Sequence, residues 1–248
     1  MPDDQLSVAA VICAAGASMR MGGVKKELLP MPEKPFTVLG SALSAFAACP
    51  RINRIVIAVS PGSEEEARAA LGELLTGSEQ DRVLFADGGD TRRASVHKAL
   101  LRLAPFNPSY VLIHDGARPW IQPELIERII DAAIKYGAVI PALPLTETPK
   151  ELESSEEGGA GEGTFIKRHL KRVTICAAQT PQGFKFPEIL AAHEKAAARE
   201  AAFLQSNAGK FAEYTDDAEV WGEFSGRVAV IPGNPSNKKI TYPEDLSL

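Results

Sequence analysis

Small and basic residues near the N-terminus have the composition of a phosphate-binding loop. The residues of this stretch that could contact a phosphate are Ala14, Ala15, Gly16, Arg20, Lys25 and Lys26. Small residues let the backbone approach a ligand closely, and fixed cations neutralise phosphate charge. The spacing matches neither the P-loop, since no Ser or Thr follows the lysines, nor the dinucleotide fingerprint, since Ser18 replaces the second glycine. The stretch predicts a polyphosphate cradle of another kind; the alternative is a glycine-rich turn with solvated cations.

Three further groups of polar residues follow apolar runs later in the chain. They are Gly88, Gly89, Asp90, Arg92 and Ser95 after the third run, His114, Asp115 and Arg118 after the fourth, and Asn237, Lys238 and Lys239 after the last. In an open α/β sheet, ligands bind beyond the carboxyl ends of the strands. We therefore expect the four groups to meet at one edge of a sheet and to form one anion-binding site.

Asp115 is the candidate metal ligand of this set. Mg²⁺ typically takes one or two carboxylates and completes its shell with phosphate oxygens and water. The alternative role for a carboxylate just past a buried strand is to cap the next helix. His114 is interpreted as a packed or hydrogen-bonded histidine rather than a general base.

Apolar runs and helical periodicities alternate along the chain. Strands are expected at residues 8–15, 55–59, 83–85, 110–114, 138–140 and 228–231. Helices are expected at residues 36–48, from Ser63 as a capping residue, at 91–103, at 123–136, from 187 to about 204, and after Thr215. Repeated strand–helix units with near-continuous apolar strands predict an α/β fold, a mostly parallel sheet with helices on both faces.

The alternation stops after Pro144. Residues 151–164 are acidic and glycine-rich and cannot bury a core, while their flanks, 142–150 and 165–175, are more ordered in composition. We expect these flanks to pair as an arm, at about residues 142–175, that projects from the sheet. No repeat and no second apolar core is visible, so residues 1–248 are expected to form one domain with this arm.

Composition and charge exclude several classes of protein. The chain has 248 residues, of which 45% are hydrophobic, and a net charge of −5, so neither wholesale disorder nor nucleic-acid binding is expected. No apolar run approaches the length of a membrane span, and the acidic start lacks the basic region of a signal peptide. The three cysteines lack zinc or disulfide spacing, which favours buried free thiols in a cytoplasmic, soluble protein.

Six motifs, in a fixed order, carry a resemblance to a known family. They lie at residues 14–22 with Lys26, at 88–96, at 114–119, at 179–182 (Gln-Thr-Pro-Gln), at 215–218 (Thr-Asp-Asp-Ala) and at 237–245. Together they resemble the 2-C-methyl-D-erythritol 4-phosphate cytidylyltransferases of the non-mevalonate isoprenoid pathway. The similarity runs from about Val8 to Leu246. The ordered set is shared with a near relative, the ribitol-5-phosphate cytidylyltransferases.

The resemblance implies a Rossmann-like nucleotidyltransferase fold and a homodimer whose arms exchange. It also implies CTP as co-substrate and Mg²⁺ as cofactor. By motif matching, Ala14, Ala15, Gly16, Gly89, Asp90 and Ser95 would bind the nucleotide, and Arg20, Lys26 and Lys239 would be the catalytic cations on the triphosphate. Asp115 would hold the metal, and Asp115, Arg118, Thr148, Arg172, Thr180 and Lys239 would surround the methylerythritol phosphate, with Thr148 and Arg172 serving the partner's site.

The chain departs from the family pattern at two places. Lys25-Lys26-Glu27 stands where the family commonly has Pro-Lys-Gln, and Glu147-Thr148-Pro149-Lys150 stands where it has Asp-Thr, an aliphatic residue and Lys. Three functions agree with the sequence: cytidylyl transfer to methylerythritol phosphate, the same chemistry on ribitol 5-phosphate, and a non-catalytic nucleotide-binding module. The intact set of cations and Asp115 disfavours the non-catalytic module, whereas sequence spacing leaves ribitol 5-phosphate open as an acceptor.

Overall fold

A twisted mixed sheet forms the centre of the molecule in the computed structural model, which describes residues 6–16, 21–32, 34–77, 79–153, 164–206 and 211–247. Its strands are β1 (Val8–Ala14), β2 (Ile52–Val59), β3 (Val83–Asp87), β4 (Tyr110–Asp115), β5 (Ala138–Pro144), β8 (Cys176–Ala178), β9 (Gln182–Lys185) and β10 (Ala229–Pro232). The order across the sheet is β10-β5-β9-β4-β1-β2-β3, with β8 paired to β5. β4, β1, β2 and β3, in that order across the sheet, are each parallel to their neighbours, and β10 is parallel to β5. β9 is antiparallel to both β4 and β5. The predicted mostly parallel α/β fold is confirmed.

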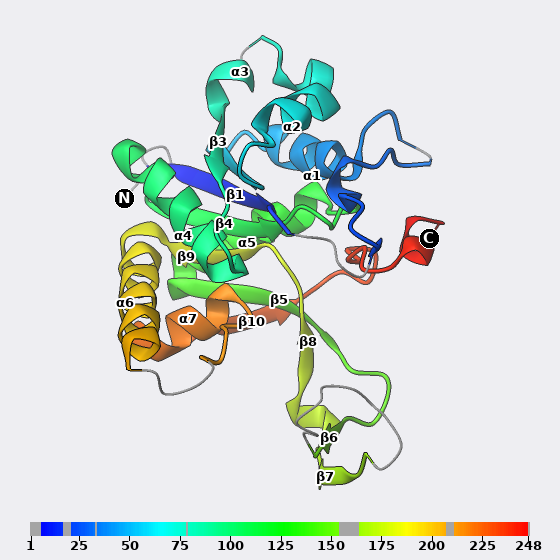
Figure 1. Ribbon diagram of the computed structural model, residues 1–248, viewed down its shortest axis with the longest axis vertical. Coiled ribbons are helices and arrows are strands. Elements are labelled where there is room, and N and C mark those ends of the chain that lie inside the picture. The colour runs from blue at the N-terminus through cyan, green and yellow to red at the C-terminus, as the bar shows by residue number, and fades with distance from the viewer. Residues whose placement is uncertain are drawn as a thin grey trace.

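Helices cover both faces of the sheet, as Figure 1 shows. They are α1 (Val38–Ala47), α2 (Glu64–Leu71), α3 (Glu79–Arg82), α4 (Arg92–Leu103), α5 (Pro123–Tyr136), α6 (Phe186–Gln205) and α7 (Asp217–Phe224). Alternate side chains of β1 supply the two cores: Ala10 and Ile12 pack with α1, α2 and α5, whereas Ala9 and Val11 pack with α4, α6 and α7. A strand buried on both faces needs a continuous apolar run, and this is the pattern that the sequence has there.

The parallel register brings the carboxyl ends of the central strands together. Cys13 of β1 lies opposite Asp115 of β4, and Ala14 lies opposite Val59 of β2. The loops that follow β1, β3 and β4 therefore start at one edge of the sheet. This edge is where the polar groups of the sequence were expected to meet.

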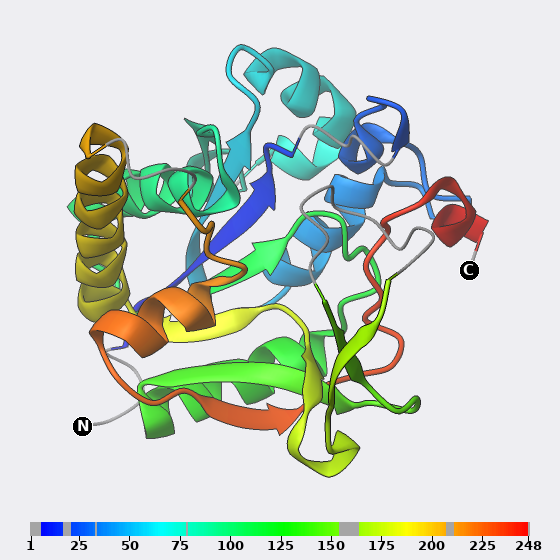
Figure 2. The same cartoon turned by 60° about the horizontal axis from the view of Figure 1, so that its bottom comes forward.

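An arm leaves the sheet beyond β5 and returns through β8. Its far end is an antiparallel pair of strands, β6 (Lys150–Leu152) and β7 (Ile166–His169), which lies away from the body of the molecule in Figure 1 and comes in front of the sheet in the turned view of Figure 2. Most of the acidic segment 151–164 lies outside the described residues. Several apolar side chains of the arm are exposed in this chain, among them Phe165 and Val173.

Four expectations need correction. The short strands β8 and β9 were not predicted. The strand expected at 55–59 begins at Ile52, because Ile52 and Ile55 both pack into the core. Ser63 makes no side-chain cap to α2, because its hydroxyl accepts a hydrogen bond from Lys25 instead. Cys13, Cys49 and Cys176 are free as expected, but Cys176 is exposed.

The described part of the chain contains no helix that combines the length and apolar character needed to cross a membrane.

Candidate functional site

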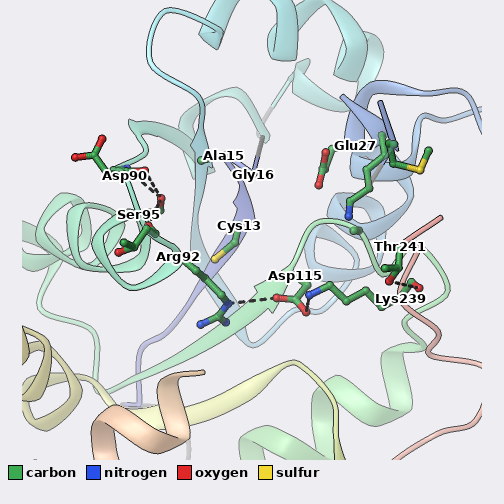
Figure 3. Close-up of a pocket in the computed structure, with 15 residues that line it drawn as sticks. Cys13, Ala15, Gly16, Glu27, Asp90, Arg92, Ser95, Asp115, Lys239 and Thr241 are labelled. Atoms are coloured by element: carbon green, nitrogen blue, oxygen red, sulfur yellow. Dashed lines mark hydrogen bonds and ion pairs between the residues drawn. The ribbon is translucent and has the colours of Figure 1, made fainter. Parts of the chain in front are cut away.

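A cavity of about 500 Å³ lies at the carboxyl ends of β1, β3 and β4. It falls in the size range of small-molecule sites. Of the residues predicted from the sequence, it is lined by Ala15, Gly16, Lys26, Gly89, Asp90, Ser95, Asp115 and Lys239. Figure 3 shows Gly16 at the end of β1, between Ser95 on one side and Asp115 and Lys239 on the other. Four separate loops of the sequence thus contribute to one site.

The loop after β3 approaches the loop after β1 because it begins with two glycines. A Cβ on Gly88 would lie 2.4 Å from Ala15 Cβ, and one on Gly89 would lie 2.5 Å from Ala94 Cβ. Ser95 Oγ accepts a hydrogen bond from Gly89 N at 3.0 Å and donates to Thr91 O at 2.9 Å. Ser95 thus holds the shape of the loop, and the loop presents backbone rather than bulky side chains to the cavity.

Asp115 lies at the centre of a cluster of cations. Its Oδ2 is 3.0 Å from Lys239 Nζ and 3.4 Å from Arg118 Nε, and its Oδ1 is 3.6 Å from Arg92 Nε. Figure 3 shows Arg92 and Lys239 approaching the carboxylate from opposite sides. Burial alone would raise the pKa of this carboxyl, but the attraction of Lys239, Arg92 and Arg118 lowers it well below its usual range. Asp115 is therefore an anion under all ordinary conditions. In the described residues its carboxylate accepts no hydrogen bond from a backbone N–H of the following turn, so it does not act as a helix cap.

A buried hydrogen-bonded layer lies directly beneath Asp115. Asp115 N donates to Thr180 Oγ1 at 3.0 Å, and the Thr180 hydroxyl contacts His114 Nδ1 at 3.1 Å. His114 is fully buried, and its Nε2 lies 3.3 Å from Arg118 O. Burial lowers the pKa of His114 to about 4. The interpretation of His114 as a packed, hydrogen-bonded histidine is confirmed. Thr180 is not among the residues that line the cavity.

The segment 179–182 connects this layer to two distant loops. Gln179 Nε2 donates to Asn234 O at 2.9 Å, and its Oε1 accepts from Asn234 N at 3.0 Å. Asn237 Nδ2 donates to Thr180 O at 2.7 Å, which fixes the loop that carries Lys239. Gln182 Oε1 accepts from the backbone N of Asp217 and Ala218, at 3.2 and 3.0 Å, at the start of α7.

Lys26 and Lys25 have different surroundings although they are adjacent. Lys26 is buried and lines the cavity. Lys25 Nζ instead contacts Glu66 Oε2 at 2.5 Å and Ser63 Oγ at 2.9 Å, on and just before α2. The expectation that both lysines belong to the phosphate cradle is therefore wrong for Lys25, because the acidic first turn of α2 provides it with a counter-charge.

Several predicted residues lie away from the cavity. Arg118 is buried behind it and donates to Asn237 O at 2.9 Å, and Ala14 lines a smaller neighbouring hollow. Thr148 and Arg172 are exposed on the arm, where Arg172 donates to Thr146 O. Arg20 lies outside the described residues.

Sequence reasoning gave no individual role to several cavity residues, among them Arg92, Glu27 and Cys13. Arg92 was seen only as one of a polar group, although the motif at 88–96 contains it. Glu27 and Cys13 also line the cavity. Burial raises the pKa of the Cys13 thiol to about 12, which disfavours the reactive thiolate form.

The described residues contain no group of three or more His, Cys, Asp or Glu side chains that could hold a metal ion. A cation at this site would rely on the Asp115 carboxylate together with oxygens of a ligand. This is the coordination that Mg²⁺ adopts when it binds through one carboxylate and phosphate groups.

Comparisons with known proteins agree with this geometry. The family model described as 2-C-methyl-D-erythritol 4-phosphate cytidylyltransferase matches residues 8–248. The protein of that name from Acidobacterium capsulatum is 36% identical over 249 residues, covering 98% of this chain and 95% of that protein. The bifunctional enzyme IspD/IspF of Bartonella henselae is 33% identical over 98% of this chain, which spans only 55% of that relative's length.

A solved structure is also similar. The crystal structure of 4-diphosphocytidyl-2C-methyl-D-erythritol synthase from Anaerococcus prevotii superposes with a TM-score of 0.76 at 28% identity, over 98% of this chain and 94% of that chain. The match of the family model to nearly the whole chain, together with the full-length relative, shows the family. The chain belongs to the 2-C-methyl-D-erythritol 4-phosphate cytidylyltransferase family.

Proposed function

We propose that this protein transfers the cytidylyl group of CTP to 2-C-methyl-D-erythritol 4-phosphate. The products are 4-diphosphocytidyl-2-C-methyl-D-erythritol and pyrophosphate. The observation that carries the proposal is the convergence of Lys26, Arg92 and Lys239 on one cavity that also contains Asp115 and the backbone of the Gly89 loop. Such a site suits two polyanions that must be brought together.

The chemistry requires alignment more than acid–base catalysis. An oxygen of the methylerythritol phosphate attacks the α-phosphorus of CTP; the bond from that phosphorus to the oxygen of the β-phosphate breaks, and pyrophosphate leaves with the electron pair. The attacking phosphate has a second pKa of about 6, so it is already ionised near neutral pH. This agrees with the absence of a histidine base from the wall of the cavity in the described residues.

The residues of the cavity divide into two groups by position. Ala15, Gly16, Gly89, Asp90 and Ser95 line the side that we assign to the cytidine, together with Ala14 beside it. Lys26 and Lys239 line the side that we assign to the triphosphate, and Arg20, outside the described residues, keeps its sequence-based role there. Cations fixed in these positions stabilise the charge that builds on the α-phosphate in the transition state.

Asp115 fits a Mg²⁺ ion that is bound jointly with the triphosphate. The carboxylate is ionised, and its Oδ1 has no protein group within hydrogen-bond distance in the described residues, since Arg92 Nε is 3.6 Å away. When bound, Mg²⁺ would neutralise phosphate charge and orient the phosphate oxygens. Lys239, which contacts Oδ2, would hold the carboxylate in place while it also faces the phosphates.

Arg118, Thr148, Arg172, Thr180 and Lys239 are the residues that we assign to the methylerythritol phosphate. Arg118 and Thr180 act from beneath the cavity, through Asp115 and the loop at Asn237. Thr148 and Arg172 are carried by the arm, and we propose that they serve the site of a second copy in a homodimer. The exposed apolar side chains of the arm, such as Phe165 and Val173, are what an interface between arms would cover. In this proposal residues 1–248 form one domain with an arm at about 142–175, and the protein acts in the cytoplasm on small molecules.

The direct test is a pyrophosphate-release assay with CTP and each of two acceptors. We expect release with 2-C-methyl-D-erythritol 4-phosphate, and much slower release with ribitol 5-phosphate at equal concentration. Equal or faster turnover of ribitol 5-phosphate would refute the substrate assignment. Binding of CTP by calorimetry without turnover of either acceptor would identify a nucleotide-binding module instead.

A further inference from the structure

A buried carboxylate, that of Asp217, lies at the start of α7 and is paired with the cavity residue Arg92. Asp217 is fully buried and belongs to the motif at residues 215–218. Its backbone N is held by Gln182, and the preceding Asp216 caps the helix by accepting from Glu219 N at 2.9 Å. The position of Asp217 is therefore fixed by β9 and by the helix cap.

Asp217 and Asp115 compete for the same guanidinium group. Arg92 Nη2 donates to Asp217 Oδ2 at 2.7 Å, whereas Arg92 Nε lies 3.6 Å from Asp115 Oδ1. The first distance is that of a charge-assisted hydrogen bond, and the second is outside hydrogen-bond range. Arg92 is thus hydrogen-bonded to Asp217, whereas it lies near Asp115 without a hydrogen bond to it.

The deeper burial of Asp217 strengthens the preference of Arg92 for Asp217 over Asp115. The side chain of Asp217 is 1% exposed and that of Asp115 is 11% exposed, so the loss of a partner would leave Asp217 more poorly solvated. Burial alone would raise the pKa of Asp217, but Arg92 and His193 lower it, so the group is ionised. Its other oxygen, Oδ1, lies 3.3 Å from His193 Nε2.

We propose that Asp217 is a positioning residue that holds Arg92 away from Asp115 and thereby keeps Asp115 Oδ1 available to a divalent cation. This inference rests on the proposed function, in which Asp115 faces Mg²⁺ bound with the nucleotide. In the described residues Arg92 pairs with two carboxylates, those of Asp217 and Asp115. Without Asp217, the guanidinium keeps only Asp115 of these two and closes the remaining gap to it. A hydrogen-bonded guanidinium on Oδ1 then occupies the oxygen that the cation would use.

The test measures CTP binding by calorimetry in EDTA and in saturating Mg²⁺. The ratio of the two dissociation constants gives the enhancement by Mg²⁺, and no turnover is required. For Asp217→Asn we expect this enhancement to fall by on the order of tenfold or more, which is the weight of one charge-assisted hydrogen bond. For the double variant Asp217→Asn with Arg92→Gln we expect the enhancement to return to near the wild-type value, because no guanidinium is left to cover Asp115.

His193→Gln is the matched control, since it removes the other neighbour of Asp217 at the same depth and leaves the contact with Arg92. It should lower the melting temperature and leave the enhancement unchanged. If the double variant stays as low as Asp217→Asn, or if His193→Gln lowers the enhancement equally, the role of Asp217 is structural and the proposal is wrong.

Arg92→Gln alone keeps the proposal testable if Asp217→Asn does not fold. It should equal or exceed the wild-type enhancement, and a fall of tenfold would show that Arg92 assists the cation and would overturn the inference. A wild-type protein that turns over both substrates but binds CTP equally in EDTA and Mg²⁺ would also overturn it. Absence of any CTP binding by the wild-type protein would instead refute the proposed function itself.

Discussion

Acid should destabilise this protein through His114 in a definite pH window. In the structure Asp115 N donates to Thr180 Oγ1, so the hydroxyl hydrogen of Thr180 is left to donate to His114 Nδ1. His114 Nε2–H donates to Arg118 O. This arrangement satisfies the neutral ring with one proton on Nε2. A second proton on Nδ1 would meet the hydroxyl hydrogen, and burial already disfavours the charged ring.

The size of the effect follows from the pKa of the ring. The pKa of His114 is lowered by burial from 6.5 to about 4. Between these values the unfolded chain binds more protons than the folded protein, so the free energy of unfolding falls as the pH falls. Integrated from pH 7 to pH 5, the loss is about 2 kcal/mol, and it is complete only below the folded pKa. Asp115 acts in a separate window, since its pKa is lowered from 3.8 and its contribution is lost only below that value.

The assay is urea unfolding of wild type and His114→Gln at pH 7 and pH 5. Glutamine can accept from Thr180 and donate to Arg118 O without titrating, so the variant should lose about 2 kcal/mol less stability between the two pH values than the wild type does. His169→Gln, at an exposed position on the arm, is the matched control and should show the wild-type loss. An equal loss in His114→Gln and in wild type would refute the reasoning, whatever the absolute stability of the variant.

Further predictions concern activity. Asp115→Asn should keep the fold and lower Mg²⁺-dependent turnover on the order of 10²-fold, and wild-type turnover at limiting Mg²⁺ would contradict the metal assignment. Lys26→Ala and Lys239→Ala should each lower turnover by on the order of 10³-fold, whereas the neighbouring Lys25→Ala should retain most of it; equal losses in initial-rate assays would show that cavity position is irrelevant. CTP should be preferred over ATP and GTP in competition assays, since a pyrimidine fits beside the backbone of the loop at Gly88 and Gly89 more easily than a purine does. Mixing inactive Arg172→Ala with inactive Lys26→Ala subunits should restore activity, and failure after confirmed subunit exchange would exclude a shared site.

The meeting of distant residues at one edge could be predicted from the sequence because it depends only on strand order and direction. Asp115 ends an apolar strand and Lys239 follows another, and a parallel sheet collects such ends on one side. The cavity residues Gly89 and Asp90 were found by the same argument. The pattern of apolar residues reflects which side chains the fold buries, so it can be recognised in the sequence without a structure.

The direction of individual side chains at those strand ends could not be predicted in this way. Lys25 and Lys26 have the same chemistry, yet Lys25 pairs with Glu66, 41 residues away in the sequence. Thr180 has a hydroxyl that suits a phosphate, yet the hydroxyl is occupied by Asp115 N and His114. These outcomes depend on tertiary neighbours that no local pattern encodes.

The strand β9 was missed for a related reason. It contains four residues, Gln182–Lys185, with a glycine inside, which by itself is typical of a loop. A Cβ on Gly183 would lie 2.8 Å from Ile129 Cγ2, so the glycine serves the close packing of α5 against the sheet. The strand forms because β4 and β5 leave a gap between them that an antiparallel segment fills.

This missed strand explains how the site is assembled. β9 and the residues before it contact the underside of Asp115 through Thr180, the loop of Lys239 through Gln179, and the start of α7 through Gln182. Each of these contacts delivers or restrains one charged group around Asp115, and all of them come from a run of four residues. An antiparallel strand runs opposite to its neighbours, so the residues that precede it, rather than those that follow it, lie at the carboxyl edge of the parallel strands. The polar side chains of residues 179–182 therefore reach the site from the amino end of their strand, where a search confined to residues that follow apolar runs could not find them.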